Sequence, residues 1–177
     1  MSVGDEQAAL RALAHPVRLR ILSLLTGSAL TASDVARELG LTHANASYHL
    51  RTLLAGGLIV PDGEERIRGG VAKRYRYDAL RDRERDHDSY QATGADTQRA
   101  LFAAVANELI RRTAEADWSF GGAMTDAELW VEPEVFREIR DRIGQASRDL
   151  HDAARAPRSP GTIRTSTTIA MFRMDES

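Results

Sequence analysis

The chain of 177 residues contains no cysteine. This excludes a disulfide framework, a cysteine zinc site, an iron–sulfur cluster and thiol catalysis. No apolar run approaches the roughly 20 residues that span a bilayer. The first residues, MSVGDEQAAL, also lack the basic start and apolar core of a signal peptide. We therefore expect a cytoplasmic protein without a membrane segment, large enough to bury a core unaided by metals or disulfides.

Sequence signatures of catalysis are missing as well. The chain has no phosphate-binding glycine loop, no Gly-x-Ser-x-Gly elbow and no His-Glu-x-x-His motif. Histidines stand beside aspartates only at His87 and His151. Neighbouring residues on a helix do not point at one centre, so these pairs make weak metal sites. We expect no enzyme activity, no metal and no cofactor.

Charge is distributed unevenly along the chain. The formal net charge is -2, yet residues 11–77 contain ten basic and five acidic residues, a net of +5. Residues 79–177 contain fourteen basic and eighteen acidic residues, a net of -4. The positive excess of the N-terminal part is compatible with an anionic partner such as nucleic acid. Scattered, solvated charge would give the same count.

The N-terminal part contains the start, end and turn signals of short helices followed by a hairpin. Pro16 suits the first turn of a helix, Gly27 suits a helix end, and Thr42 can cap a helix. These signals predict helices over residues 5–14, 16–27, 31–40 and 42–55. A strand over 58–60 and a hairpin of residues 64–68 and 71–77 follow. This order is typical of a winged helix-turn-helix.

The C-terminal part alternates helix and strand patterns. We predict a helix from about 97 to 116, a strand over 128–132, a helix from Pro133 and a β-prone stretch over 162–174. The predicted fold class is α+β, mainly helical. Its expected parts are a winged helix-turn-helix domain over 1–78, a charged connector over 79–96 and a dimerisation or effector segment over 97–177.

The fourth helix has the polar face that a recognition helix needs. Its apolar residues fit one side, which leaves short polar groups and one basic group on another. Such groups can reach base edges and phosphates in the major groove, although an ordinary surface helix would also be polar. The candidate DNA contacts are Thr42, His43, Ala44, Asn45, Ser47, Tyr48 and Arg51. Asn45 is best suited to a bidentate contact with adenine.

The hairpin supplies a second set of candidate contacts. Basic residues gather around its tip, where a wing can follow the phosphate backbone or enter the minor groove. The candidates are Arg66, Arg68, Lys73 and Arg74. A solvated hairpin would have the same composition.

Four separated motifs agree with one known family. The stretch LAHPVRLRIL over 13–22 looks like the opening helix pair of ArsR-type bacterial repressors, and residues 33–59 resemble that family's helix-turn-helix. Ser47-x-His49-Leu50-x-x-Leu53 and Gly57-Leu58-Ile59 match its pattern, and residues 66–77 resemble its wing. The resemblance spans residues 8–78. It implies a homodimeric DNA-binding protein, usually a repressor.

The chain departs from the family in one respect that limits the kind of effector it could bind. Its best-known members bind metal through cysteines, which this chain lacks, so any effector would not be a metal. Five side chains in the C-terminal part could line a pocket for an apolar effector, or form the core of a dimerisation unit: Trp118, Phe120, Trp130, Met171 and Phe172.

We therefore expect a homodimeric repressor that binds a palindromic site in double-stranded DNA, with a small-molecule effector as a further partner. The alternative is a winged-helix adaptor that binds protein and no DNA.

Overall fold

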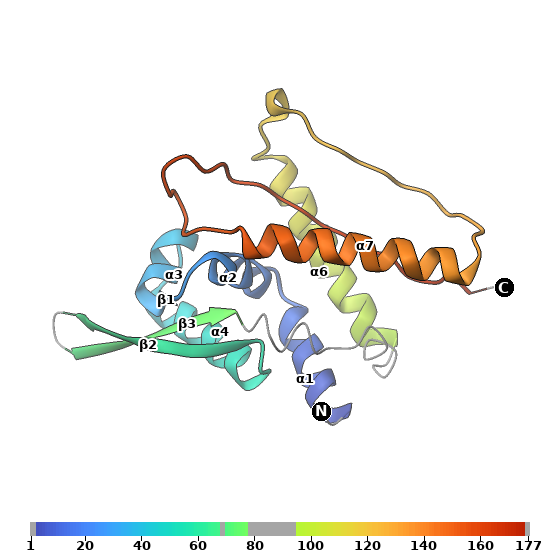
Figure 1. The fold of residues 1–177 in the computed structure, drawn as a ribbon. Coiled ribbons are helices and arrows are strands. Elements are labelled where there is room, and N and C mark those ends of the chain that lie inside the picture. Colours follow the sequence, from blue (N-terminus) through green and yellow to red (C-terminus); the bar gives the residue numbers. More distant parts are fainter. Residues whose placement is uncertain (1–2, 68–69, 78–94, 176–177) are drawn as a thin grey trace.

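Four helices and a small sheet form the N-terminal part of the protein (Figure 1). The computed structural model describes residues 3–67, 70–77 and 95–175. The helices are α1 (Val3–Leu13), α2 (Pro16–Gly27), α3 (Ala32–Leu39) and α4 (His43–Ala55). The strands are β1 (Leu30–Thr31), β2 (Ile59–Ile67) and β3 (Gly70–Tyr77). The predicted helices are thus confirmed, and the predicted winged helix-turn-helix is formed.

Local side-chain chemistry explains where α3 begins and ends. The Thr31 hydroxyl accepts a hydrogen bond from the Asp34 backbone N–H, and the Asp34 carboxylate accepts one from the Thr31 N–H, which closes a capping box. Burial would raise the pKa of Asp34, but hydrogen bonds from Thr31 and Arg37 lower it below its ordinary value. Gly40 ends the helix with φ 66°, a left-handed conformation that glycine adopts without strain.

The sheet has the strand order β1-β3-β2, and both pairs are antiparallel. Sequence patterns predicted two strands of the hairpin but missed β1, which has only two residues and pairs with Tyr75 and Arg74. The predicted strand over 58–60 and the first hairpin strand form one continuous strand, β2, with a register shift between Pro61 and Glu64. The long β2–β3 hairpin is the wing.

One hydrophobic core holds the helix-turn-helix together. It is built from the buried faces of α1, α2, α3 and α4 and the start of β2. Its largest fully buried side chains are Ile21, Leu25, Val35, Leu50, Leu53 and Ile59. Helix α6 (Ala95–Thr113) packs against α1 and α2, so it lies beside this core although the predicted domain boundary precedes it.

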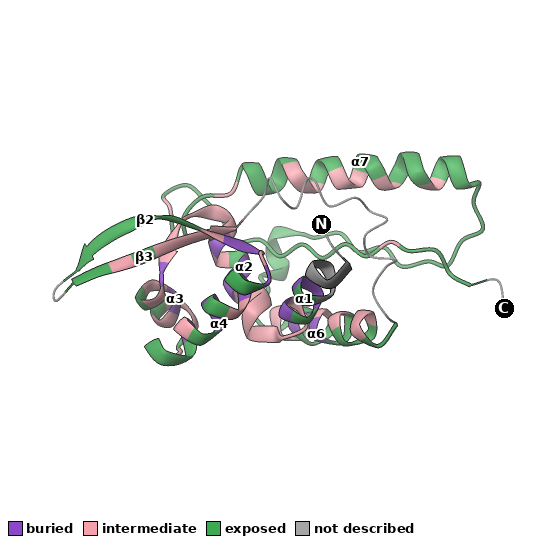
Figure 2. Ribbon diagram, turned by 90° about the horizontal axis from the view of Figure 1, so that it is seen from below, coloured by how far each residue is buried: buried purple, intermediate pink, exposed green. Residues whose placement is uncertain are grey.

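The C-terminal half contains helices but no core of its own. The 3-10 turn η2 (Trp118–Phe120) and helix α7 (Pro133–Asp152) follow α6. Glu108 is the last buried residue, and every residue from 109 to 175 is exposed or half-buried (Figure 2). The apolar stripe of α7, which includes Ile139, therefore lacks a covering layer within this chain.

The α+β class is confirmed, but the predicted C-terminal strands are not formed. Residues 123–132 and 162–174 run as extended segments without strand partners (Figure 1). Threonine and isoleucine favour strands only where a neighbouring strand completes the hydrogen-bond ladder. The C-terminal order in this chain is therefore helix, extended segment, helix, extended segment.

The segment after α7 returns to the helix-turn-helix and contacts it at two points. The Arg158 guanidinium donates hydrogen bonds of 2.8 and 2.9 Å to the two Glu38 carboxylate oxygens on α3. Gly27 lies against the Arg155 backbone so closely that a Cβ there would stand 2.2 Å from the Arg155 carbonyl oxygen. A side chain at position 27 would displace this segment, so the glycine allows the close approach.

Candidate nucleic-acid interface

Helix α4 buries one face and exposes the other. Ala46, His49, Leu50 and Leu53 are buried against the core. The Thr42 hydroxyl accepts a hydrogen bond of 3.2 Å from the Asn45 N–H and so caps the helix. Tight packing on one side fixes the orientation of the side that faces solvent, as a recognition helix requires.

The predicted contact residues of α4 lie on its free side. Thr42, His43, Ala44, Asn45, Tyr48 and Arg51 are exposed, and Ser47 is half-buried. Tyr48 is 56% exposed although its ring packs edge-on against His49, with 5.3 Å between the ring centroids. The structure thus brings these seven residues together on one surface, which we call the α4 face. Leu54, expected in the core, is 36% exposed instead.

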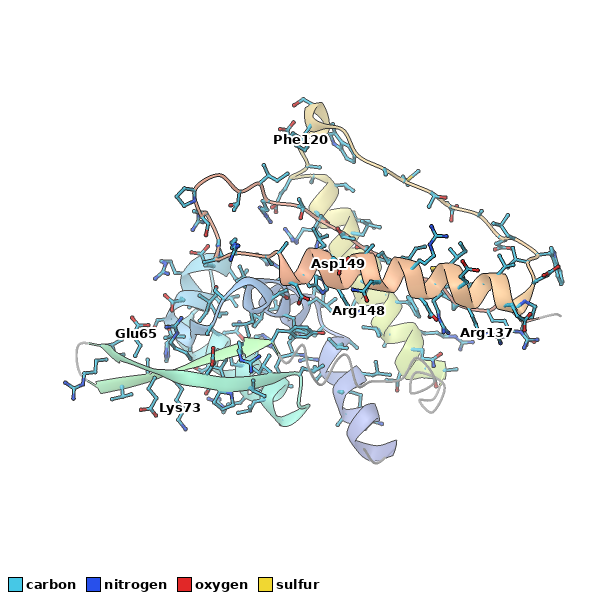
Figure 3. The ribbon with its side chains drawn as sticks, in the orientation of Figure 1. Glu65, Lys73, Phe120, Arg137, Arg148 and Asp149 are labelled. Atoms are coloured by element: carbon cyan, nitrogen blue, oxygen red, sulfur yellow. The ribbon has the colours of Figure 1, made fainter. Side chains whose placement is uncertain are left out.

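The wing presents two different faces. Glu64 pairs with Lys73 and Arg66 with Val71 across the hairpin, so these four side chains share one face. Glu65 pairs with Ala72 and lies on the other face, and Figure 3 shows Glu65 and Lys73 pointing in opposite directions. Arg66 and Lys73 are both exposed. They are the described basic side chains of the tip, since Arg68 lies outside the described residues.

Arg74 has a structural partner that the sequence did not reveal. Its guanidinium donates hydrogen bonds of 2.7 and 3.3 Å to the Ala29 carbonyl, and the side chain is half-buried. It holds the wing against the segment that leads into β1. Arg76 lies 3.7 Å from the Asp62 carboxylate across the hairpin. Of the three predicted wing contacts that the structure describes, Arg74 is therefore the one already engaged within the chain.

Two histidines of the motifs that resemble the family, His15 and His49, form a cluster beneath α4. The ring centroids of His15 and His49 are 4.9 Å apart. His15 Nδ1 accepts a hydrogen bond of 3.2 Å from the Val17 N–H, which caps α2. Burial and then the charge of Arg18 lower the pKa of His15, and burial, His15 and Arg18 lower that of His49. The cluster joins the start of α2 to the recognition helix.

This cluster should make the domain sensitive to acid. Both histidines are easier to protonate in the unfolded chain, where the pKa is about 6.5. Stability is therefore complete above about pH 6.5 and falls as the pH drops toward the lowered folded values. Urea unfolding at pH 8 and at pH 5.5 should show lower stability at pH 5.5.

The matched control for this prediction is His49→Gln, which removes one titrating ring and keeps a polar side chain of similar reach. The difference between the two pH values should shrink in this variant. A wild-type protein equally stable at both pH values would contradict the assignment, as would an unchanged difference in His49→Gln.

The five predicted effector residues do not converge. Trp118, Phe120, Trp130 and Phe172 are exposed, Trp130 to 91%, and Met171 is half-buried. One ring contact involves the set: Phe172 lies 5.6 Å from Phe102 on α6. Figure 3 shows Phe120 on η2, at the top of the view and away from the wing.

The remaining sequence expectations concern the two histidines beside aspartates, the charged connector and the absence of a membrane segment. His151 is exposed near the end of α7, while His87 and almost all of the predicted connector lie outside the described residues. No helix in the part of the chain that the structure describes is long and apolar enough to cross a membrane.

Comparison with known proteins agrees with the geometry. Residues 13–61 match the family model of a helix-turn-helix domain. No curated protein matches the chain. Two solved structures from Mycobacterium bovis are similar, both of fragments 1–100. One is a crystal structure of a possible transcriptional regulatory protein, with 26% identity over 66% of this chain and 98% of that chain and a TM-score of 0.38.

The other is a solution structure of a homodimeric winged helix-turn-helix DNA-binding domain from a possible ArsR-family transcriptional regulator. It has 25% identity over 68% of this chain and 89% of that chain, with a TM-score of 0.37. TM-scores this low establish neither fold nor assembly here. The match over 13–61, the core beneath α4 and the β2–β3 wing together make the N-terminal part of this chain a winged helix-turn-helix domain, a DNA-binding fold.

Proposed function

We propose that this protein is a homodimeric transcriptional repressor that binds an inverted repeat in double-stranded DNA. The observation that carries the proposal is the α4 face, a polar surface on a helix whose opposite side is buried, next to a wing with Arg66 and Lys73 exposed. The α4 face would read bases in the major groove, and the wing would hold the flanking backbone.

Selection of bound sequences from a random duplex pool tests the proposal directly. A two-fold symmetric dimer should recover two inverted half-sites, because the symmetry of the protein is mirrored in its site. Half-site centres about 34–36 Å apart would correspond to one helical turn of DNA. Recovery of no enriched sequence, together with no binding to any duplex at low salt, would refute DNA recognition.

Asn45 is expected to contribute to sequence reading. Its amide can make two hydrogen bonds to adenine, so Asn45→Ala should cost about 1–3 kcal/mol on the selected site and little on random DNA. Arg51→Ala is the comparison variant, because a lost phosphate contact should weaken binding to both sequences alike. Titration of each variant against both duplexes makes the measurement. If Asn45→Ala lost equal binding free energy on the two duplexes, Asn45 would not be one of the residues that recognise bases.

The wing is expected to contribute affinity without sequence preference. The double variant Arg66→Ala plus Lys73→Ala should bind all duplexes more weakly, and each lost phosphate contact should flatten the log–log salt dependence by roughly one unit. Binding measured between low and moderate salt gives this slope.

A charge-matched control is available on α7. Arg137→Ala plus Arg148→Ala removes the same charge far from the wing (Figure 3). This control should leave the slope unchanged. Identical slopes in the two double variants would place the tip of the wing off the DNA.

A further inference from the structure

The C-terminal half of this chain exposes apolar side chains that a complete fold would bury. Large apolar side chains are exposed on both extended segments and on α7, among them Leu129, Trp130, Ile139, Ile163, Ile169 and Phe172. Isolated exposed residues are ordinary, but this many large apolar side chains exposed on neighbouring parts of the sequence point to surfaces that a partner covers.

The area left exposed is of the size that a stable dimer hides. The chain has a solvent-accessible surface of 12580 Å². A compact monomer of 19.5 kDa exposes about 8500 Å². The surplus, about 4000 Å² over the whole chain, is large enough to include the roughly 1000–2500 Å² that each subunit of an obligate dimer buries. A second copy of the chain is therefore a large enough occupant.

The two extended segments also have unused backbone. Residues 123–131 and 163–172 make no backbone hydrogen bond to any other part of the chain that the structure describes. The segment 162–174 contains six β-branched residues and neither proline nor glycine, a composition that favours strands. Unpaired backbone next to exposed apolar side chains is a template for strand pairing.

Contacts with α6 leave part of residues 162–174 free. Arg164 lies 2.9 Å from the Glu115 carboxylate beyond the end of α6, and Phe172 packs on Phe102. The segment thus lies along α6 through these two side chains, while Ile163 and Ile169 remain 61% and 49% exposed.

The charges of the two segments are complementary. Residues 123–132 contain Asp126, Glu128 and Glu132 and no basic residue. Residues 162–174 contain Arg164 and Arg173 and no acidic residue. Figure 1 shows the segments on separate paths, the first leading from η2 to the start of α7 and the second passing behind α7.

We propose that residues 123–132 of one copy pair as a β-strand with residues 162–174 of a second copy. A two-fold axis would create two equivalent pairings, acidic segment to basic segment in each, and would bring the α7 stripes over the shared core. This inference deepens the proposed function and rests on it for the role of the dimer, which is to hold two α4 faces at fixed spacing. The sheet predicted for the C-terminal half would then form between chains.

Cross-linking of full-length chains tests the pairing, and the absence of native cysteine gives a clean background. Ala127→Cys and Thr167→Cys chains with different tags are mixed, unfolded, refolded together and treated with a short bis-maleimide. We expect a covalent species that carries both tags. Ala44→Cys, at the exposed start of α4, is the control and should not cross-link to itself, because two recognition helices lie a helical turn of DNA apart.

Proline substitution separates strand pairing from side-chain packing. Proline has no N–H to donate, and the N–H groups of neighbouring residues in a strand point to opposite sides. Either Thr167→Pro or Thr168→Pro should therefore raise the dimer dissociation constant at least about tenfold. Thr167→Val and Thr168→Val keep the N–H and should leave the constant nearly unchanged. Sedimentation of each full-length variant gives the constants.

The outcomes distinguish this inference from the proposed function. A dimer that yields no cross-linked species with both tags, or that tolerates both prolines, would overturn the pairing of the two segments while specific binding to an inverted repeat still stood. A wild-type chain that sediments as a monomer at micromolar concentration would also overturn the proposed pairing of residues 123–132 with residues 162–174 of a second copy. Loss of dimer in one proline variant with normal thermal unfolding of the helix-turn-helix would support it.

Discussion

Deletion of residues 114–177 is expected to lower affinity for the two-half-site operator by about 10²- to 10⁴-fold and to leave affinity for a single half-site nearly unchanged. Two linked recognition helices gain from effective concentration once the first is bound, and a lone helix does not. The deletion retains α6, which packs on α1 and α2, and keeps the whole core of the helix-turn-helix. The shortened protein should therefore fold.

Sedimentation and binding to half and full sites measure this effect. Arg158→Ala is the control, because it removes the contact with Glu38 on α3 and keeps the C-terminal half. It should bind the full site far better than the deletion variant. A shortened protein that stays dimeric and binds the full site as tightly as the intact chain would contradict the prediction. Such a result would place the dimer contact within α1 to α6.

The second large effect is expected from two adjacent leucines of α4. Leu53 is 0% exposed and belongs to the core, whereas Leu54 is 36% exposed. Leu53→Ala should lower the free energy of unfolding by about 2–5 kcal/mol, because it removes buried methyl groups and leaves a cavity. Leu54→Ala should cost about 1 kcal/mol or less, because much of its side chain is already in water.

Urea unfolding of the two variants measures the difference, and the same substitution on the same helix makes each the control of the other. Domains of this kind are stable by only about 5–15 kcal/mol, so Leu53→Ala should also raise the unfolded fraction and reduce DNA binding. Equal losses in the two variants would mean that α4 does not rest on the core through the side that contains Leu53.

Much of the N-terminal fold was predictable because its signals are local. Pro16, Gly27 and Gly40 mark helix ends through their own backbone preferences, and Thr42 through its hydroxyl. The spacing of Ala46, Leu50 and Leu53 placed the buried side of α4 correctly. The candidate contacts on that helix followed by elimination, since they occupy the side left over.

Contacts between distant parts of the chain were not predictable in this way. Arg74 looked like a phosphate contact until the structure placed its guanidinium on the Ala29 carbonyl, 45 residues away. The contact between the tilted rings of His15 and His49 and the ion pair of Arg158 with Glu38 are of the same kind. Each depends on how helices meet, which a pattern within one helix does not specify.

The sequence by itself determined the winged helix-turn-helix and the exposed polar side of its fourth helix, because caps, glycines and apolar spacing act within a few residues. Tertiary structure alone decided which basic side chains of the wing remain free and whether β-prone segments become strands. Residues 162–174 have strand composition but no strand partner among the residues that the structure describes. A strand exists only where a second segment completes its hydrogen bonds, and that partner is a property of the assembled fold.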